Sequence, residues 1–318
     1  MYSAHFRNIL ALTAIMIGMA GCISPNDRTP TQSNIEATET SNSPIPVNTD
    51  ISVLEQGKTV FWTGGCASCH AAPGATGDAL RQLGGGLKLK TRFGTFNVPN
   101  ISPDKATGIG NWTKNEFTNA VLNGLAPDGS HYYPSFPYTS YARMTKRDVA
   151  SLWSYLQSLP PVANKVEDHQ IPLLIKSRRA IGLWKKLYFN REKAVQLSNP
   201  TPEIIRGQYL VEGPGHCGEC HTPRNIIGGF DYKNWLAGGP AEDGEGIIPN
   251  ITPHVDGLGD KSVEDIVASL EPTMAHDGAA SAGSSMAYIR ENMAKLPLSD
   301  RRAIAAYLKA IPAIASKD

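Results

Sequence analysis

The sequence contains the pattern Cys-x-x-Cys-His twice, at Cys66-Ala-Ser-Cys69-His70 and at Cys217-Gly-Glu-Cys220-His221. This spacing is typical of covalent c-type haem attachment, in which two thiols bind the porphyrin and the adjoining imidazole binds the iron. We therefore expect two covalently bound haem c groups. Thioether bonds are predicted from Cys66, Cys69, Cys217 and Cys220, and the proximal iron ligands are predicted to be His70 and His221.

Two other uses of paired cysteines were weighed. The pairs together could bind one zinc ion, but zinc ribbons usually place their pairs about 15–20 residues apart, and here nearly half the chain separates them. Each pair could instead be a redox dithiol, which expects a βαβ surrounding that this sequence lacks. A histidine directly after both second cysteines favours haem.

The fifth cysteine, Cys22, follows a short basic start and an apolar run that is too short to span a bilayer. The stretch Met19-Ala20-Gly21-Cys22 resembles the lipobox of bacterial lipoproteins. We expect residues 1–21 to be a lipoprotein signal peptide and Cys22 to carry the lipid anchor, at the periplasmic face of a bacterial membrane. The alternative is an ordinary secretory signal with an unpaired cysteine. Residues 22–50 are rich in Ser, Thr, Pro and Asn, and this composition predicts a flexible tether.

The charge balance excludes one class of partner. Removal of residues 1–21 removes Arg7 and leaves 29 basic and 29 acidic side chains, to which haem propionates would add negative charge. Because the sequence has no basic run interleaved with aromatic residues, we expect no nucleic-acid binding.

The chain carries an internal repeat at domain scale. Val98-Pro99-Asn100-Ile101-Ser102-Pro103 follows the first histidine, and Ile248-Pro249-Asn250-Ile251-Thr252-Pro253 follows the second at nearly the same distance. A glycine-rich turn precedes this motif in both places. We name residues 51–162 the first repeat, residues 203–318 the second repeat, and residues 163–202 the linker.

Helical patterns begin and end each repeat. Helices are expected around Gly57–Thr63 and Ile204–Glu212, before each cysteine pair. Thr113-Lys-Asn-Glu116 and Ser262-Val-Glu-Asp265 are shaped like capping boxes. Terminal helices are expected to open at Thr145 and at Ser299-Asp300, and prolines stop both. Since strand-like alternation is scarce, the predicted fold class is all-α.

The linker is longer than typical loops, so it should have structure of its own or pack on something. Residues 175–189 resemble a basic amphipathic helix. The plainer interpretation is that this helix covers the seam between the repeats. The other is a face for docking a partner or a membrane surface.

The distal iron ligands decide between electron transfer and chemistry on a bound molecule. Methionine is the usual distal ligand of electron carriers and commonly lies just before the terminal helix. Met144 is the only methionine between the two histidines, which makes it the candidate in the first repeat. The second repeat offers Met274, Met286 and Met293, and spacing alone does not separate Met286 from Met293.

Several stretches resemble the multi-haem cytochrome c subunits of bacterial membrane-bound alcohol and gluconate dehydrogenases and their dihaem relatives. They are Tyr133 to Thr145, Arg206 to Arg224 and Ser285-Met286-Ala287, and the likeness covers about residues 52–312. It implies two class I cytochrome c domains in tandem, joined by a packed linker, with Met144 and Met286 as distal ligands. The three-haem members have one further haem domain without a counterpart here, so we do not expect direct quinone reduction.

The resemblance implies an electron-transfer protein rather than an enzyme. It would pass electrons from a periplasmic dehydrogenase to a downstream cytochrome or oxidase of the respiratory chain. The alternative is a dihaem enzyme of the peroxidase kind, with one open or labile haem iron beside acid–base groups. His276 would be a competing distal ligand, whereas His131, His169, His216 and His254 are expected to be solvated or hydrogen-bonding loop residues.

Overall fold

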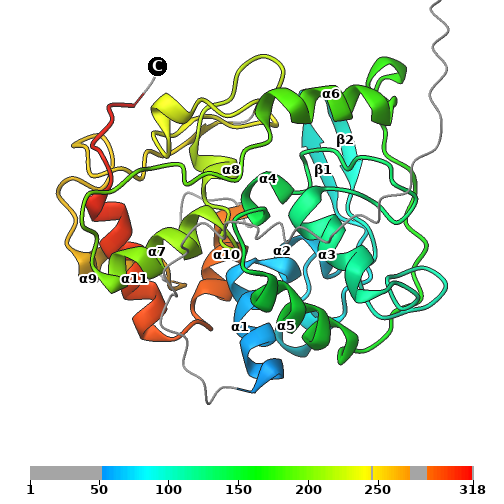
Figure 1. Cartoon of the computed structure of the whole chain (residues 1–318). Coiled ribbons are helices and arrows are strands. Elements are labelled where there is room, and N and C mark those ends of the chain that lie inside the picture. Colours follow the sequence, from blue (N-terminus) through cyan, green and yellow to red (C-terminus); the bar gives the residue numbers. More distant parts are fainter. Residues whose placement is uncertain (1–51, 245, 273–284, 317–318) are drawn as a thin grey trace, which may run out of the picture. The chain divides into compact units, whose positions relative to one another are not determined.

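The computed structural model describes residues 52–244, 246–272 and 285–316, and all of them belong to one compact unit. The expectations for the signal peptide, Cys22, the tether, Met274 and His276 lie outside these residues. The described chain is mostly helical (Figure 1). In the first repeat the α-helices are α1 (Val53–Thr63), α2 (Cys66–His70), α3 (Lys114–Asn123), α4 (Tyr138–Tyr141) and α5 (Lys146–Gln157).

The second half repeats this order after the linker helix α6 (Arg178–Tyr188). Its α-helices are α7 (Pro202–Glu212), α8 (Gly218–His221), α9 (Val263–Ser269), α10 (Ser285–Met293) and α11 (Leu298–Ala310). Three short 3-10 helices lie at Gly77–Arg81, Leu173–Ile175 and Tyr232–Asn234. None of the helices in the described part of the chain has the length and apolar character that a bilayer crossing requires.

In each repeat the first helix pairs with the last, α1 with α5 and α7 with α11 (Figure 1). A glycine stands at each crossing. A Cβ atom on Gly57 would lie 2.1 Å from the Ser151 carbonyl oxygen, and one on Gly207 would lie 1.8 Å from the Ala303 carbonyl oxygen. Only glycine lets the two backbones approach so closely.

The predicted helix starts agree with the structure at most positions. Thr113 and Ser262 form complete capping boxes with Glu116 and Asp265. Thr145 caps α5 through the backbone N–H of Asp148. The helix α11 begins at Leu298 instead of at Ser299, so this prediction was wrong by one residue. The Asp300 carboxylate there binds the Arg206 guanidinium of α7, at 2.9 and 2.8 Å.

Two short antiparallel hairpins qualify the all-α prediction. Strand β1 (Lys88–Thr91) pairs with β2 (Gly94–Asn97), and β3 (Gly239–Pro240) pairs with β4 (Ile247–Ile248). Each hairpin leads directly into the Pro-Asn motif of its repeat. The pattern was missed because these strands are too short to show an alternation of apolar and polar residues.

The linker helix α6 lies against both repeats, as the plainer interpretation predicted. Its Lys185 ammonium donates to the carbonyl oxygens of Asn123 and Gly124 in the first repeat. Its Trp184 Nε1 donates to the Ile227 carbonyl oxygen in the second repeat, at 2.8 Å. The helix therefore bridges the two repeats by polar contacts.

Candidate haem-binding sites

Both attachment histidines have the same orientation. His70 Nδ1 lies 2.8 Å from the Pro99 carbonyl oxygen, and His221 Nδ1 lies 2.8 Å from the Pro249 carbonyl oxygen. A carbonyl oxygen only accepts, so Nδ1 carries the proton in both rings and Nε2 is left with its lone pair. This is the usual arrangement for a histidine that binds a metal through Nε2.

The Pro-Asn motif holds that carbonyl group in the same way in each repeat. The Asn100 side chain accepts from the Ser102 N–H at 2.9 Å and donates to the Val162 carbonyl oxygen at 2.7 Å. In the second repeat Asn250 accepts from the Thr252 N–H at 2.8 Å and donates to the Ile314 carbonyl oxygen at 2.7 Å. Each asparagine thereby ties the proline loop to the chain that follows the last helix.

The backbone of each histidine is also fixed equivalently. The Gly85 N–H donates to the His70 carbonyl oxygen, and the Gly238 N–H donates to the His221 carbonyl oxygen, both at 2.8 Å. The glycine-rich turn and the Pro-Asn motif thus hold the imidazole from two sides. This repeated geometry explains why the sequence preserves both motifs at the same distance from each histidine.

Burial sets the protonation state of the site residues. Burial raises the pKa of Cys66 and Cys217 to about 12 and that of Cys69 to about 11, and it also raises the pKa of Cys220. A redox dithiol needs the opposite shift, toward a reactive thiolate. Burial lowers the pKa of His70 to about 4 and lowers that of His221. Both imidazoles are therefore neutral, which is the form that binds iron.

No disulfide joins the cysteines in the described part of the chain. In the described part of the chain, no three His, Cys, Asp or Glu side chains are grouped as ligands for a metal ion. The donor set of each site is instead two thiols and one neutral imidazole within five residues, and this set fits covalent haem c.

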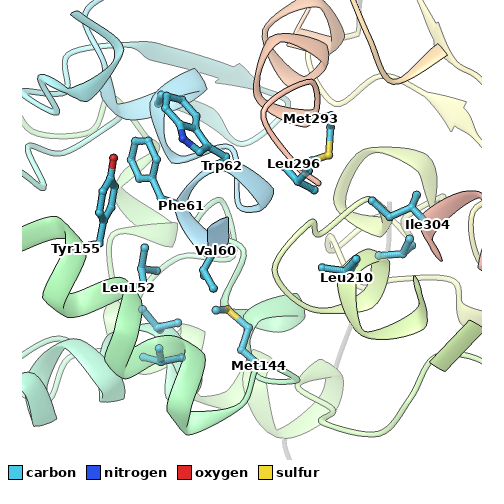
Figure 2. Close-up of a cluster of buried hydrophobic side chains, with 14 of the residues drawn as sticks. Val60, Phe61, Trp62, Met144, Leu152, Tyr155, Leu210, Met293, Leu296 and Ile304 are labelled. Carbon is cyan, nitrogen blue, oxygen red and sulfur yellow. The ribbon is translucent and has the colours of Figure 1, made fainter. Parts of the chain in front are cut away.

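The candidate distal ligands differ in burial. The Met144 side chain is buried and belongs to the same apolar cluster as Val60 of α1 and Leu210 of α7 (Figure 2). Met286 is half-buried in the first turn of α10. Met293 is buried near the end of α10 and packs in the same cluster, as a core residue does (Figure 2). Burial does not choose among these candidates, because Met144 and Met293 pack in the same cluster and Met274 lies outside the described residues. Met286 is the methionine that the family resemblance indicates.

The four described histidines outside the two motifs have hydrogen-bonding roles in loops, as expected. His169 Nδ1 accepts from the Asn97 N–H at 3.2 Å, and His216 Nε2 lies 3.2 Å from the Gly64 carbonyl oxygen. His131 Nδ1 lies 3.2 Å from Lys185 Nζ, and His254 Nδ1 lies 3.1 Å from Asp256 Oδ2.

The two attachment segments lie close to one another. Burial is the main cause of the raised pKa of Cys69, and the nearby Cys220 raises this pKa further by charge repulsion. The Asn292 side chain of α10 donates to Ser68 Oγ, inside the first motif, at 2.5 Å. In the second motif Glu219 accepts from Thr139 Oγ1 and Ser140 Oγ, both at 2.7 Å. Each motif is therefore packed against the other repeat.

Sequence reasoning missed the polar residues of this seam. Glu219 stands between the two cysteines of the second motif and pairs with Arg224 at 2.5 Å. Arg143 directly precedes Met144, and its buried side chain reaches Glu212, which is also buried. The charge of Glu219 between two cysteines, and that of Arg143 beside Met144, were the sequence signals that could have indicated these contacts.

Paired thiols followed directly by a neutral imidazole, in a mostly helical chain, are the donor set of proteins that bind haem covalently. The cytochrome c family profile matches residues 54–160. The chain is 51% identical to a "Diheme cytochrome c-type" protein of Cereibacter sphaeroides, over 81% of this chain and 86% of that protein. The chain belongs to the cytochrome c family, whose members transfer electrons, and it is related to a dihaem member.

Other relatives are subunits of dehydrogenases. The chain is 35% identical to the cytochrome c subunit of the alcohol dehydrogenase (quinone) of Gluconobacter oxydans, over 83% of this chain and 56% of the relative. It is 34% identical to the gluconate 2-dehydrogenase cytochrome c subunit of Pantoea cypripedii, over 82% of this chain and 60% of the relative. The chain thus spans little more than half the length of these two subunits.

Proposed function

We propose that this chain is a dihaem electron carrier in which each repeat forms one class I cytochrome c domain. In this proposal Cys66 and Cys69 attach the first haem, and Cys217 and Cys220 attach the second. The axial pairs are His70 with Met144 and His221 with Met286. The observation that carries the proposal is the pair of matching hydrogen bonds from Nδ1 of each histidine to a proline carbonyl oxygen, at 2.8 Å in both repeats.

When bound, haem iron supplies a one-electron couple between its ferric and ferrous states. The chain supplies the rest. The proline carbonyls orient the imidazoles, and burial keeps the imidazoles neutral. The apolar cluster around Met144 excludes water from the distal side, and the thioether favours ferrous iron. If His70 with Met144 and His221 with Met286 hold the two irons, oxidation and reduction would need no exchange of ligands.

The donor in this proposal is a periplasmic dehydrogenase, because several relatives are cytochrome subunits of dehydrogenases. A downstream cytochrome or oxidase of the respiratory chain accepts the electrons. Anchoring through a lipid on Cys22 would keep the protein at the periplasmic face of a bacterial membrane. The packing of each attachment motif against the other repeat supports transfer between the two haems, because the motifs lie close together.

The test is reduction of the purified holoprotein by a purified periplasmic dehydrogenase and its substrate, followed by stopped-flow absorbance of the haem bands. Substrate-dependent reduction of both haems, with no turnover of added peroxide, is the expected result. Peroxide turnover with one five-coordinate haem would instead indicate the peroxidase-like alternative.

A further inference from the structure

Side chains of the segment that carries the candidate ligand Met144 form several hydrogen bonds with the other half of the chain. We name residues 138–144 the Met144 segment. It includes α4 and ends directly before the cap of α5. Its neighbour in the fold is the end of α7, where a Cβ atom on Gly213 would lie 3.8 Å from Met144 Cγ. The contacts below show what holds this segment.

Arg143 extends from the Met144 segment into the linker and the second repeat. Its side chain is only 6% exposed. Nε donates to the Glu192 carbonyl oxygen at 2.7 Å, and Nη2 donates to Tyr232 Oη at 3.2 Å. Nη1 donates back to the Thr139 carbonyl oxygen of its own segment at 2.9 Å. The guanidinium thus joins the segment to two separate parts of the chain by directed bonds.

The charged partner of Arg143 is itself fixed. Glu212 Oε2 lies 3.9 Å from Arg143 Nε, and its side chain is 2% exposed. The Glu212 carboxylate accepts from the Ala194 N–H at 2.8 Å, from Gln208 Nε2 at 2.9 Å and from Tyr307 Oη at 2.5 Å. These three donors fix the Glu212 carboxylate in place. The guanidinium of Arg143 therefore stays near this carboxylate in only one position.

The start of the Met144 segment is also bonded to the second repeat. Thr139 and Ser140 donate to Glu219, which lies within the second attachment motif. Glu219 in turn pairs with Arg224 of the second repeat, and both side chains are about 90% buried or more. The segment is therefore fastened at both ends to the second half of the chain.

We propose that Arg143 is a positioning residue for Met144, so that ligation of the first haem depends on the linker and the second repeat. This inference rests on the proposed function, in which the Met144 sulfur binds iron. A thioether is a weak ligand for ferric iron, and it stays bound only where the chain holds it in place. The bonds of Arg143, one residue away, hold it, and a variant that loses them should release the methionine more readily.

The experiment compares holoprotein variants by two measures of methionine ligation. One is the weak near-infrared band of methionine-ligated ferric haem, and the other is the affinity for added imidazole, which replaces the methionine. Arg143→Gln removes the guanidinium, and Tyr232→Phe removes one acceptor from the far side of the seam without changing a charge. Loss of one charge-assisted hydrogen bond changes an equilibrium constant by about tenfold. We therefore expect imidazole to bind one haem about tenfold more tightly in Arg143→Gln than in the wild type. Tyr232→Phe should shift the affinity in the same direction by less.

Two further variants make the outcome decisive. Arg147→Gln is the matched control, because Arg147 is an exposed arginine close to Met144 in the sequence, and it should behave as the wild type. Met144→Leu should abolish the near-infrared band of one haem. If it does not, the proposed ligand is wrong and this inference fails with it. If Met144→Leu abolishes the band while Arg143→Gln and Tyr232→Phe both bind imidazole as the wild type does, the ligand stands and the role of Arg143 is refuted. Should Arg143→Gln fail to fold, Tyr232→Phe decides alone.

Discussion

Replacing Gly207 with alanine should separate the helices that frame the proposed second haem site. The new Cβ atom would lie 1.8 Å from the Ala303 carbonyl oxygen and 2.8 Å from Tyr307 Cβ, whereas ordinary contacts begin near 3.4 Å. The helices α7 and α11 must therefore part by about 1.6 Å, the difference between the clash and an ordinary contact. Overpacking of this kind costs about 1–3 kcal/mol, and alanine returns about 1 kcal/mol through its helix propensity. Because the clash is with backbone, we place the net loss at about 2 kcal/mol.

The assay is urea unfolding of the holoprotein followed by far-ultraviolet circular dichroism. Gly57→Ala should act similarly on the first repeat, where its Cβ atom would lie 2.1 Å from the Ser151 carbonyl oxygen. Arg302→Ala, on the exposed side of α11, is the control and should change the free energy of unfolding by less than about 0.5 kcal/mol. A Gly207→Ala protein as stable as this control would refute the close crossing of α7 and α11.

Three further predictions concern the sites and a helix cap. Alanine at both Cys217 and Cys220 should remove one covalent haem from the mass of the holoprotein and leave the other. Met286→Leu should remove the near-infrared band of one haem, whereas Met293→Leu, a change in the packed core, should keep the band and cost less than about 1.5 kcal/mol. Hydrogen bonds from the N–H and hydroxyl of Thr113 lower the pKa of Glu116 below 4.5, so its charge stabilises the fold above that pH. Urea midpoints should show that the advantage of the wild type over Glu116→Gln shrinks as the pH falls through that lowered pKa, and a constant difference would contradict the capping box.

The helix frame was predictable because its signals are local in the sequence: the boxes at Thr113 and Ser262 define helix starts within four residues. The two Cys-x-x-Cys-His pentapeptides are equally local signals, and covalent haem attachment at their cysteines stays a prediction. The Pro-Asn motif was noticed as a repeat. Its role as the acceptor for Nδ1 of the attachment histidines emerged only from the structure, because the two groups lie 29 and 28 residues apart.

The linker helix over the seam was predicted, but the individual polar contacts between the repeats were not, because they join residues far apart in the chain. The bond between Asn292 and Ser68 joins residues separated by 224 positions, and no pattern in either stretch indicates it. Arg143 and Glu212 were also not expected at the seam, because a charged residue is ordinarily expected on the surface and both of these side chains are buried.

The central claim is that both repeats bind haem through two thioethers, one histidine and one methionine. Intact mass spectrometry of the holoprotein, combined with near-infrared spectra of its ferric form, tests it most directly. We expect the mass of two covalent haems on every chain and a methionine-ligated signal from each of them. A chain that carries one haem, or a second haem without that signal, would contradict it.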